Sequence, residues 1–502
     1  MKKSVGILSG LAVAIAVATT AGAWYTGKQL PAELARSVER GNDELKKAVA
    51  GTGGSMTIEL VSLEQRFFTS TAHYRLKVEN LQTGEGEPLN FEVAVLDQIE
   101  HGPFPWSRVK AGKLLPVMAT SNSTLQKDDF TAPWFAAAGD KAPVTAQVSI
   151  GYGGSVDSDI RLAPVNFKED DGRTLDFSGM QLLLSGDREG KAVKIHGTAD
   201  KLAMNLVNED QPPVKLQFNG LKIGGELTGT EHDMVYLGHL DLYLAEAQAT
   251  VGPKQDVLLF KGLEQNSLYS AEGENRLGAR LSYKVSDITY AGRAVGSGQM
   301  VFTMKSLDIP AMQSLVTWYQ TKLPAIQAAA AQGQQAPSLD MTPQEEVKVK
   351  ADLQQLLAAK PQLGLEDLSF KTANGHSRFS LVLDLANPTS FDLPSDQLGK
   401  QLVSKLQGKL SLSKPMIGDL ATLQALLDGQ TDAQAIAAQS GQAGEMVGMM
   451  AVQSGMATVQ GDDVVSSLHY ADGMVDFNGR KMTVEQFAMM LGAHLAALSP
   501  QG

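Results

Sequence analysis

Histidines and carboxylates are the side chains that most often hold metals and move protons, so their spacing indicates whether a chain has a catalytic or metal centre. None of the eight histidines stands in the His-Glu-x-x-His pattern that places zinc ligands on one helix face. His232 and His239 are the closest pair, and their spacing matches no standard ligand set. We therefore expect them at the surface or at a sheet edge, and we predict no bound metal and no cofactor.

Nucleophilic catalysis is equally poorly supported. The chain contains no Cys, which removes thiolate nucleophiles, thiolate metal sites and disulfides together. It contains no Gly-x-Ser-x-Gly elbow, and Ser297 and Ser454 stand beside glycines without a histidine that sequence can assign to them. The segment 151–154 lacks the Lys-Ser/Thr of a phosphate-binding loop, and Asp157 and Asp159 lack the spacing of a calcium loop. We interpret them as a strand-end turn and a solvated loop, and we predict that the protein is not an enzyme.

One loop, His101-Gly102-Pro103-Phe104-Pro105-Trp106, brings a histidine, two prolines and two aromatic residues close together. Because proline fixes the backbone φ angle, a rigid, packed turn is the expected structure. The alternative is a stiff aromatic corner that contacts a ligand, the bilayer or a partner, and Pro133-Trp134-Phe135 could belong to the same surface. A structural and a functional role both stay open for His101, Gly102, Pro103, Phe104 and Pro105.

A second unusual stretch, between Gly444 and Met456, combines small residues with methionines. The spacing of Gly444 and Gly448 favours close contact between helices, but Glu445 and Gln453 argue against a second membrane span. Packing between helices is therefore expected, with a flexible methionine surface for lipid or protein as the alternative.

Composition restricts the partners. Lys and Arg total 43 against 55 for Asp and Glu, the net charge is -12, and no long basic stretch offers a track for phosphates. This balance argues against a nucleic-acid partner. A hydrophobic fraction of 43% and a charged fraction of 20% are typical of a folded chain.

The strongest signal in the chain is an uncharged run from Ser4 to Gly27, long enough to cross about 30 Å of hydrocarbon as a helix. We expect an uncleaved membrane anchor, because a signal-peptide core is usually shorter and an aromatic pair before Lys28 is typical of a membrane interface. Cleavage after Ala23 is the alternative. The anchor residues are Val5, Ile7, Leu8, Leu11, Val13, Ile15, Val17, Trp24 and Tyr25.

Charge next to this run predicts its orientation. Lys2 and Lys3 precede it, and positive charges stay on the cytoplasmic side of a membrane. We therefore expect a cytoplasmic N-terminus and an extracytoplasmic body from about Lys28 onward.

The body is predicted to be rich in β-structure. Apolar and polar residues alternate in segments such as 91–95, 144–150 and 240–244, with turn motifs such as Asn219-Gly220 between them. This alternation predicts antiparallel strands with one covered and one solvated face, because strands buried on both faces would be uniformly apolar.

Helical patterns frame the β-rich region. An amphipathic helix is predicted at residues 31–50, and helical spacing returns after Asp308 up to a break expected at Pro324. A capping box begins a helix at Thr342, and further helices are predicted at 395–406, 417–427 and 432–450. The chain ends in a small antiparallel meander and a helix capped by Thr483.

The fold class is therefore α+β: an N-terminal transmembrane helix, then a long, mostly antiparallel curved β-sheet with a helical insertion in the C-terminal half. The predicted parts are a membrane anchor at 1–28, an amphipathic connecting helix at 29–54, an extended β-rich body at 55–308, a mixed helical insertion at 309–460, and a terminal β-meander with a docking helix at 461–502.

Four segments together resemble the YdgA/YihF family of Gram-negative envelope proteins of unknown function, over the full length of the chain. They are Ala23-Trp24-Tyr25-Thr26-Gly27-Lys28, the loop His101-Gly102-Pro103-Phe104-Pro105, Ile150-Gly151-Tyr152-Gly153, and the ending with Phe477-Asn478-Gly479, Lys481 and Met482. The resemblance implies a single-pass inner-membrane protein with a periplasmic body, with a homodimer as one oligomeric state, and it carries no catalytic residues. The YihF branch is also grouped with AsmA-like proteins, whose curved sheets are proposed to shelter lipid acyl chains.

Together these observations predict a non-enzymatic, inner-membrane-anchored periplasmic protein that maintains the envelope through lipid binding or transport. The alternative is a structural or assembly factor that binds envelope proteins. The partners expected are the inner membrane, phospholipid, and a second copy or an envelope protein. A lipid role would require a continuous apolar groove, whereas a closed core with a dimeric or partner-binding patch would favour the alternative.

Overall fold

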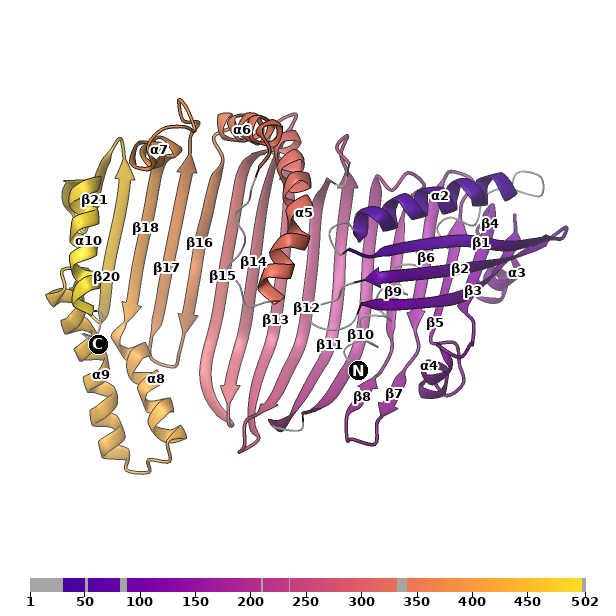
Figure 1. Ribbon diagram of the computed structural model, residues 1–502. Coiled ribbons are helices and arrows are strands. Elements are labelled where there is room, and N and C mark those ends of the chain that lie inside the picture. The colour runs from indigo at the N-terminus through magenta and orange to yellow at the C-terminus, as the bar shows by residue number, and fades with distance from the viewer. Residues whose placement is uncertain are drawn as a thin grey trace. The chain divides into compact units, whose positions relative to one another are not determined.

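The structure is a computed structural model that describes residues 30–49, 53–81, 88–208, 211–233, 235–331 and 341–498 (Figure 1). The predicted anchor, residues 1–28, lies outside the described residues, so the transmembrane helix stays a prediction. None of the helices that the structure describes is both long and apolar enough to cross a bilayer. The chain divides into two compact units: unit 1 is Met1–Leu242 with Val316–Asp340, and unit 2 is Tyr243–Leu315 with Met341–Gly502.

Unit 1 contains eleven complete strands and three helices within the described residues. The strands are β1 (Ser55–Gln65), β2 (Thr69–Leu81), β3 (Leu89–His101), β4 (Ala119–Leu125), β5 (Val144–Ile150), β6 (Ser155–Leu162), β7 (Val165–Lys168), β8 (Thr174–Phe177), β9 (Met180–Asp187), β10 (Ala192–Asn208) and β11 (Gln211–Gly229). The helices are α2 (Leu30–Ala48), α3 (Trp106–Lys110) and α4 (Ala132–Ala137). β12 (Tyr236–Val251) and α5 (Ile309–Ala331) are divided between the two units.

The strands of unit 1 pair in an antiparallel meander. β1 to β6 pair in chain order, β6 pairs with β9, β9 with β10, and β10 with β11. The hairpin of β7 and β8 joins the same sheet because β8 also pairs with β10. This pairing confirms the antiparallel strands that alternation predicts.

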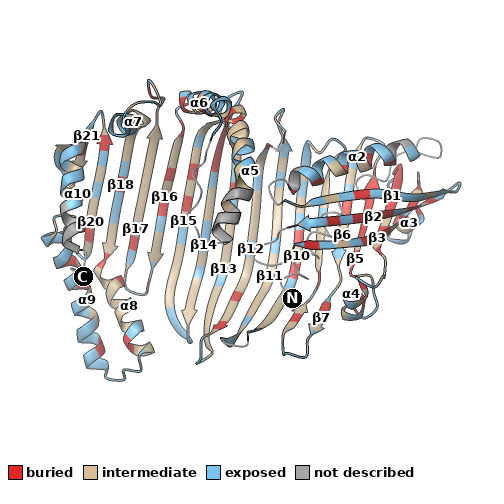
Figure 2. Ribbon diagram, in the orientation of Figure 1, coloured by how far each residue is buried: buried red, intermediate tan, exposed pale blue. Residues whose placement is uncertain are grey.

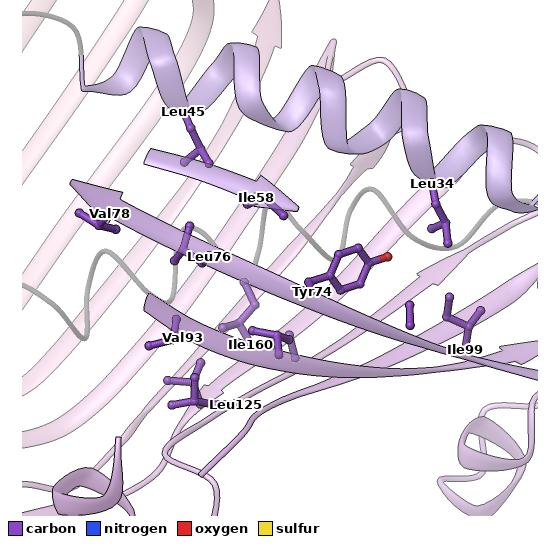
Figure 3. Packing of buried hydrophobic residues seen from close by; sticks show 14 of the residues in the cluster. Leu34, Leu45, Ile58, Tyr74, Leu76, Val78, Val93, Ile99, Leu125 and Ile160 are labelled. Carbon is purple, nitrogen blue, oxygen red and sulfur yellow. The ribbon is translucent and has the colours of Figure 1, made fainter. Parts of the chain in front are cut away.

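The core of unit 1 lies between α2 and the inner face of β1 to β6. Because side chains alternate along a strand, every second residue of these strands points to this face. Figure 3 shows Leu34 and Leu45 of α2 directed at Ile58, Tyr74 and other strand residues. The amphipathic helix predicted at 31–50 is thus confirmed, and its apolar stripe is what attaches it to the sheet.

Asn42 fixes the register of α2 on the edge strand β1. Its side-chain Oδ1 accepts a hydrogen bond from Ile58 N at 2.7 Å, and its Nδ2 donates to Ile58 O at 3.0 Å. The side-chain amide therefore takes the place of a neighbouring strand at this point of the exposed edge, which limits pairing with another chain.

Unit 2 contains ten strands and five helices within the described residues. The strands are β13 (Asp256–Ala271), β14 (Arg276–Tyr290), β15 (Arg293–Asp308), β16 (Gln362–Lys371), β17 (His376–Leu385), β18 (Val403–Ser413), β19 (Thr458–Gln460), β20 (Asp463–Ala471), β21 (Met474–Phe477) and β22 (Arg480–Thr483). The helices are α6 (Pro343–Ala358), α7 (Ser395–Leu402), α8 (Lys414–Leu427), α9 (Ala433–Gln453) and α10 (Val484–Leu498).

These strands also form an antiparallel meander, in the order β13 to β18, then β20, β21 and β22, with the short β19 beside β20. The helices are inserted between strands that remain neighbours, so the second half is a continuing sheet with helical insertions. Figure 1 shows α8 and α9 as an antiparallel helix pair beyond the ends of the strands.

Several local predictions for unit 2 are confirmed. Thr342 and Glu345 form both hydrogen bonds of a capping box at the start of α6. Thr483 and Gln486 exchange the corresponding pair at the start of α10. α10 then packs on the terminal meander through Phe487, whose ring centroid lies 5.3 Å from that of Phe477.

Two helix boundaries were wrong. The break expected at Pro324 does not occur, because α5 continues to Ala331 although proline removes one intrahelical hydrogen bond. The helix expected at 395–406 ends at Leu402, since the segment from Val403 pairs with β17 and β20 as strand β18. Tertiary pairing overrides helix propensity there. The five-part division of the chain stays a prediction.

Candidate functional site

Apolar side chains line up in three cross-strand rows on one face of the unit 2 sheet, which we call the apolar face. Residues directly opposite in an antiparallel pair share a face, so the observed register places each row together. The rows run from β15 through β16, β17 and β18 to β20. They are Met304, Leu363, Leu383, Leu406 and Tyr470; Phe302, Leu365, Leu381, Gly408 and Leu468; and Met300, Leu368, Phe379, Leu410 and Ser466.

The apolar face is only partly covered. Of its thirteen large apolar residues, Tyr470 alone is buried, while Leu368 is 45% exposed and Leu410 37% exposed. The other ten are of intermediate exposure. In Figure 2, tan marks intermediate exposure, and it is the colour that dominates β13 to β17. A soluble protein rarely leaves so continuous an apolar surface accessible unless something binds there.

The opposite face of the same strands is polar. Leu381 lies on the apolar face, and its neighbour Ser380 points the other way, towards Arg378 and Lys409. These three residues line a depression of about 620 Å³. Arg378 Nε donates to Asp367 at 2.7 Å, so the carboxylate is already neutralised by a structural ion pair.

The His101 loop combines a packed base with an exposed tip. His101 is buried at the end of β3, where its Nε2 lies 3.0 Å from Ser70 Oγ and its Nδ1 lies 3.2 Å from Phe67 O. Both ring nitrogens therefore have structural partners. The Gly102–Pro103 peptide bond is cis.

Gly102 allows two backbone segments to approach closely. A Cβ atom at this position would lie 1.9 Å from Val117 O and 2.7 Å from Met118 O, which no side chain can tolerate. Gly102 N donates to Met118 O at 2.7 Å across this contact. The predicted rigid turn is correct for this part of the loop.

The aromatic residues of the loop are not packed. Phe104 is 59% exposed, and Trp106, at the start of α3, is also exposed. Trp134 and Phe135, which the alternative interpretation would have placed on the same surface, are instead buried near the start of β3, at the opposite end of that strand from His101. They do not join the loop's aromatic residues, because α4 turns both rings into the core.

The remaining polar candidates have ordinary structural roles. Gly151 N donates to Ser155 O at 2.9 Å, which confirms the strand-end turn. Asp157 and Asp159 lie in strand β6, not in a loop, because alternation continues through them. Although burial raises the pKa of Asp159, hydrogen bonds from Arg161 and Gln181 outweigh it and lower the pKa.

The described residues contain no group of three or more His, Asp and Glu placed to hold a metal ion. His239 lies on β12 with its Nε2 3.7 Å from Asp241 Oδ2, and both side chains are largely exposed. His232 lies in the loop before this strand.

Gly444 of α9 acts in helix packing, as predicted. A Cβ at Gly444 would lie 2.6 Å from Lys414 O of α8, so the close approach of the two helices requires glycine there. Met446, Met449 and Met450 of the same helix remain exposed.

One buried acid was not predicted from the sequence. Asp97 is fully buried on the inner face of unit 1, where Ser121 Oγ donates to its Oδ1 at 2.6 Å. Within the described part of the chain, neither Asp97 Oδ2 nor the Tyr74 hydroxyl has a hydrogen-bond partner. Burial raises the pKa of Asp97 to about 6, against the smaller opposing effect of its hydrogen bonds from Ser121, Ser123 and the Asn122 backbone.

A sequence signal for Asp97 existed. Val93, Val95 and Ile99 alternate towards the core, and Asp97 occupies the matching position between them. A charged residue at a core-facing position of a strand is unusual enough to mark it. Burial and the charge of Asp97 also raise the pKa of Tyr74.

Comparison with known proteins places the chain in a family. It matches the family described as "Bacterial protein of unknown function (DUF945)" over residues 1–485, and it belongs to that family. It is 29% identical to "Protein YdgA" of Escherichia coli (strain K12), over 98% of this chain and 97% of that protein. It is 24% identical to "Uncharacterized protein YihF" of the same organism, over 96% of this chain and 98% of that protein.

A third relative is an uncharacterized protein of Haemophilus influenzae, 22% identical over 53% of this chain and 71% of that protein. No solved structure matches the chain. The resemblance to YdgA and YihF is therefore confirmed, and the names of these relatives state no activity, ligand or partner.

We predict that Gly102→Ala destabilises the protein by about 1–3 kcal/mol, because the added methyl group forces two backbone segments apart. Phe104→Ala, two residues away, should change the free energy of unfolding by less than about 0.5 kcal/mol, because the ring is exposed. Urea unfolding of both variants measures the difference. Equal destabilisation would show that the tip of the loop is packed.

We also predict that Asp97→Asn changes the pH dependence of stability. Since the pKa of Asp97 is about 6 when folded and near 3.8 when unfolded, the native state binds more protons between these values, and stability falls as pH rises. The contribution lost between about pH 4 and pH 7 is about 3 kcal/mol. Urea unfolding across this pH range measures the free energy of unfolding of both proteins. It should decline with pH in the unmodified protein and not in the Asp97→Asn variant. The same decline in both proteins would contradict the prediction.

Proposed function

We propose that this protein is a non-enzymatic, inner-membrane-anchored periplasmic protein that maintains the cell envelope by binding or transporting lipid. The observation that carries the proposal is the apolar face of unit 2, which is continuous over five strands and only partly covered. The anchor and the location rest on the sequence alone, through the uncharged run from Ser4 to Gly27 and its preceding lysines.

The chemistry of the apolar face favours acyl chains as its occupant. The three rows contain leucine, phenylalanine and methionine with one glycine, one serine and one tyrosine, and the tyrosine hydroxyl already donates to Lys400 O, so the rows offer dispersion contacts and almost no directional hydrogen bonds. Each methylene moved out of water onto such a surface contributes about 0.8 kcal/mol. Flexible methionines at Met300 and Met304 suit a ligand without a fixed shape.

The other predicted role, binding of an envelope protein, would also cover an apolar face. Protein interfaces, however, usually combine an apolar centre with a polar rim that supplies specific hydrogen bonds. Here the rows remain apolar from β15 to β18, and the charged residues lie on the opposite face of the same strands. We therefore place lipid first.

A photoreactive benzoylphenylalanine at position 381 of the full-length protein tests the proposal in cells. We expect phospholipid adducts at position 381 and none at the matched control position 380, because the two neighbours point to opposite faces. Mass spectrometry of the labelled peptides identifies the adduct. Adducts to a protein at position 381 would favour the assembly role, and a folded protein without lipid adducts would contradict lipid binding.

A further inference from the structure

The most exposed large apolar side chains of unit 1 lie together at one end of its sheet. They belong to the β1–β2 turn, the loop after β3 with α3, the segment before β4, and the β5–β6 turn. Exposure is 86% for Phe67 and 78% for Leu115. We call this set the aromatic end; it consists of Phe67, Phe68, Phe104, Trp106, Leu114, Leu115 and Tyr152.

Backbone hydrogen bonds hold these segments side by side. His101 N donates to Phe68 O at 2.9 Å, Val117 N to Pro103 O at 3.0 Å, and Met118 N to Ile150 O at 2.7 Å. The β1–β2 turn, the loop after β3, the segment before β4 and the end of β5 are therefore successive neighbours. The exposed side chains are presented by one fixed framework and not by independent loops.

Specific contacts keep Trp106 at the surface. Glu100 Oε2 accepts hydrogen bonds from Ser107 N at 2.8 Å and from Ser107 Oγ at 2.7 Å, which fixes the start of α3. Lys110 Nζ lies 5.4 Å from the centre of the Trp106 ring. An exposed tryptophan beside a lysine is the combination typical of membrane interfaces.

The segments that carry the aromatic end are basic, although the whole chain is acidic and Glu100, Asp157 and Asp159 lie beside these segments. Segments 66–68, 102–118 and 151–154 contain four basic residues and no acidic residue, although the net charge of the protein is -12. Arg108 is buried against Ser149, which leaves Arg66, Lys110 and Lys113 exposed. Basic side chains around apolar ones complement a surface of anionic phospholipid.

The described chain begins at the same end. Asn42 is hydrogen-bonded to Ile58, so these two residues lie side by side. From this point α2 extends about 18 Å towards its first residue, Leu30, and β1 extends about 23 Å in the same direction to Gln65. Figure 3 accordingly shows Leu34 towards Ile99 and Leu45 towards Val78. The uncharged run ends at Gly27, only three residues before Leu30.

We propose that the aromatic end of unit 1 rests on the phospholipid bilayer, with its rings and leucines at the headgroup–acyl boundary and its basic residues at lipid phosphates. The inference rests on the membrane anchor of the proposed function, because the uncharged run ends at Gly27, three residues before Leu30 at this end of unit 1. The contact would fix how unit 1 is oriented on the membrane.

Site-directed spin labelling tests this contact directly, since the chain has no Cys to remove. In the full-length Phe68→Cys and Leu115→Cys proteins, a nitroxide is attached to the introduced Cys. Each labelled protein is then reconstituted into vesicles of phosphatidylethanolamine and phosphatidylglycerol. Lys141→Cys is the control, because Lys141 is exposed at the opposite end of unit 1, just before β5. Flotation measures anchoring, and collision with oxygen or with an aqueous nickel chelate measures the depth of the label.

We expect the ratio of oxygen to nickel accessibility at positions 68 and 115 to be several-fold above that at position 141. Equally aqueous labels on protein that floats with the vesicles would overturn this inference and leave the anchor intact. Loss of flotation would overturn the anchor and this contact together. Dipolar broadening between labels at position 68 would show a second copy on this surface and would also overturn it.

Discussion

Antiparallel backbone pairing in a fixed register is the constraint on which the rest of the structure depends. Each strand alternates apolar and polar side chains, and the pairing collects most of the apolar ones on one side, with an irregularity between Leu365 and Leu368 that keeps both on the same face. In unit 2 this produces a sheet with a polar face at Arg378 and Ser380 and an apolar face at Leu381. A shift of one residue in any strand would exchange its two faces.

The two units cover their apolar faces differently. In unit 1, the stripe of α2 closes the face and creates a core in which Leu34 and Ile99 are fully buried. In unit 2, the side chains of the apolar face remain partly exposed. Their burial therefore contributes less to the free energy of unfolding than full burial would. A surface that forgoes this stabilisation is a natural place for a ligand to bind.

Local signals in the sequence predicted most elements, because alternation, capping boxes at Thr342 and Thr483, and turn pairs act over a few residues. They could not predict that Val403 starts a strand, since its partners lie far along the chain. Nor could they place Phe104 with Phe67, because only the pairing of β1 to β5 brings those segments together. The apolar face was visible as alternation, but whether helices cover it depends on tertiary structure.

Lipid analysis of the protein from cells tests the central claim most directly. A protease site at Gln29 allows the body to be released from washed membranes after the full-length chain has folded, and native mass spectrometry follows without detergent. The account predicts phospholipid bound at a reproducible ratio, and loss of that lipid in a folded Leu381→Glu protein. A lipid-free body, or lipid retained equally by the variant, would contradict lipid binding at the apolar face.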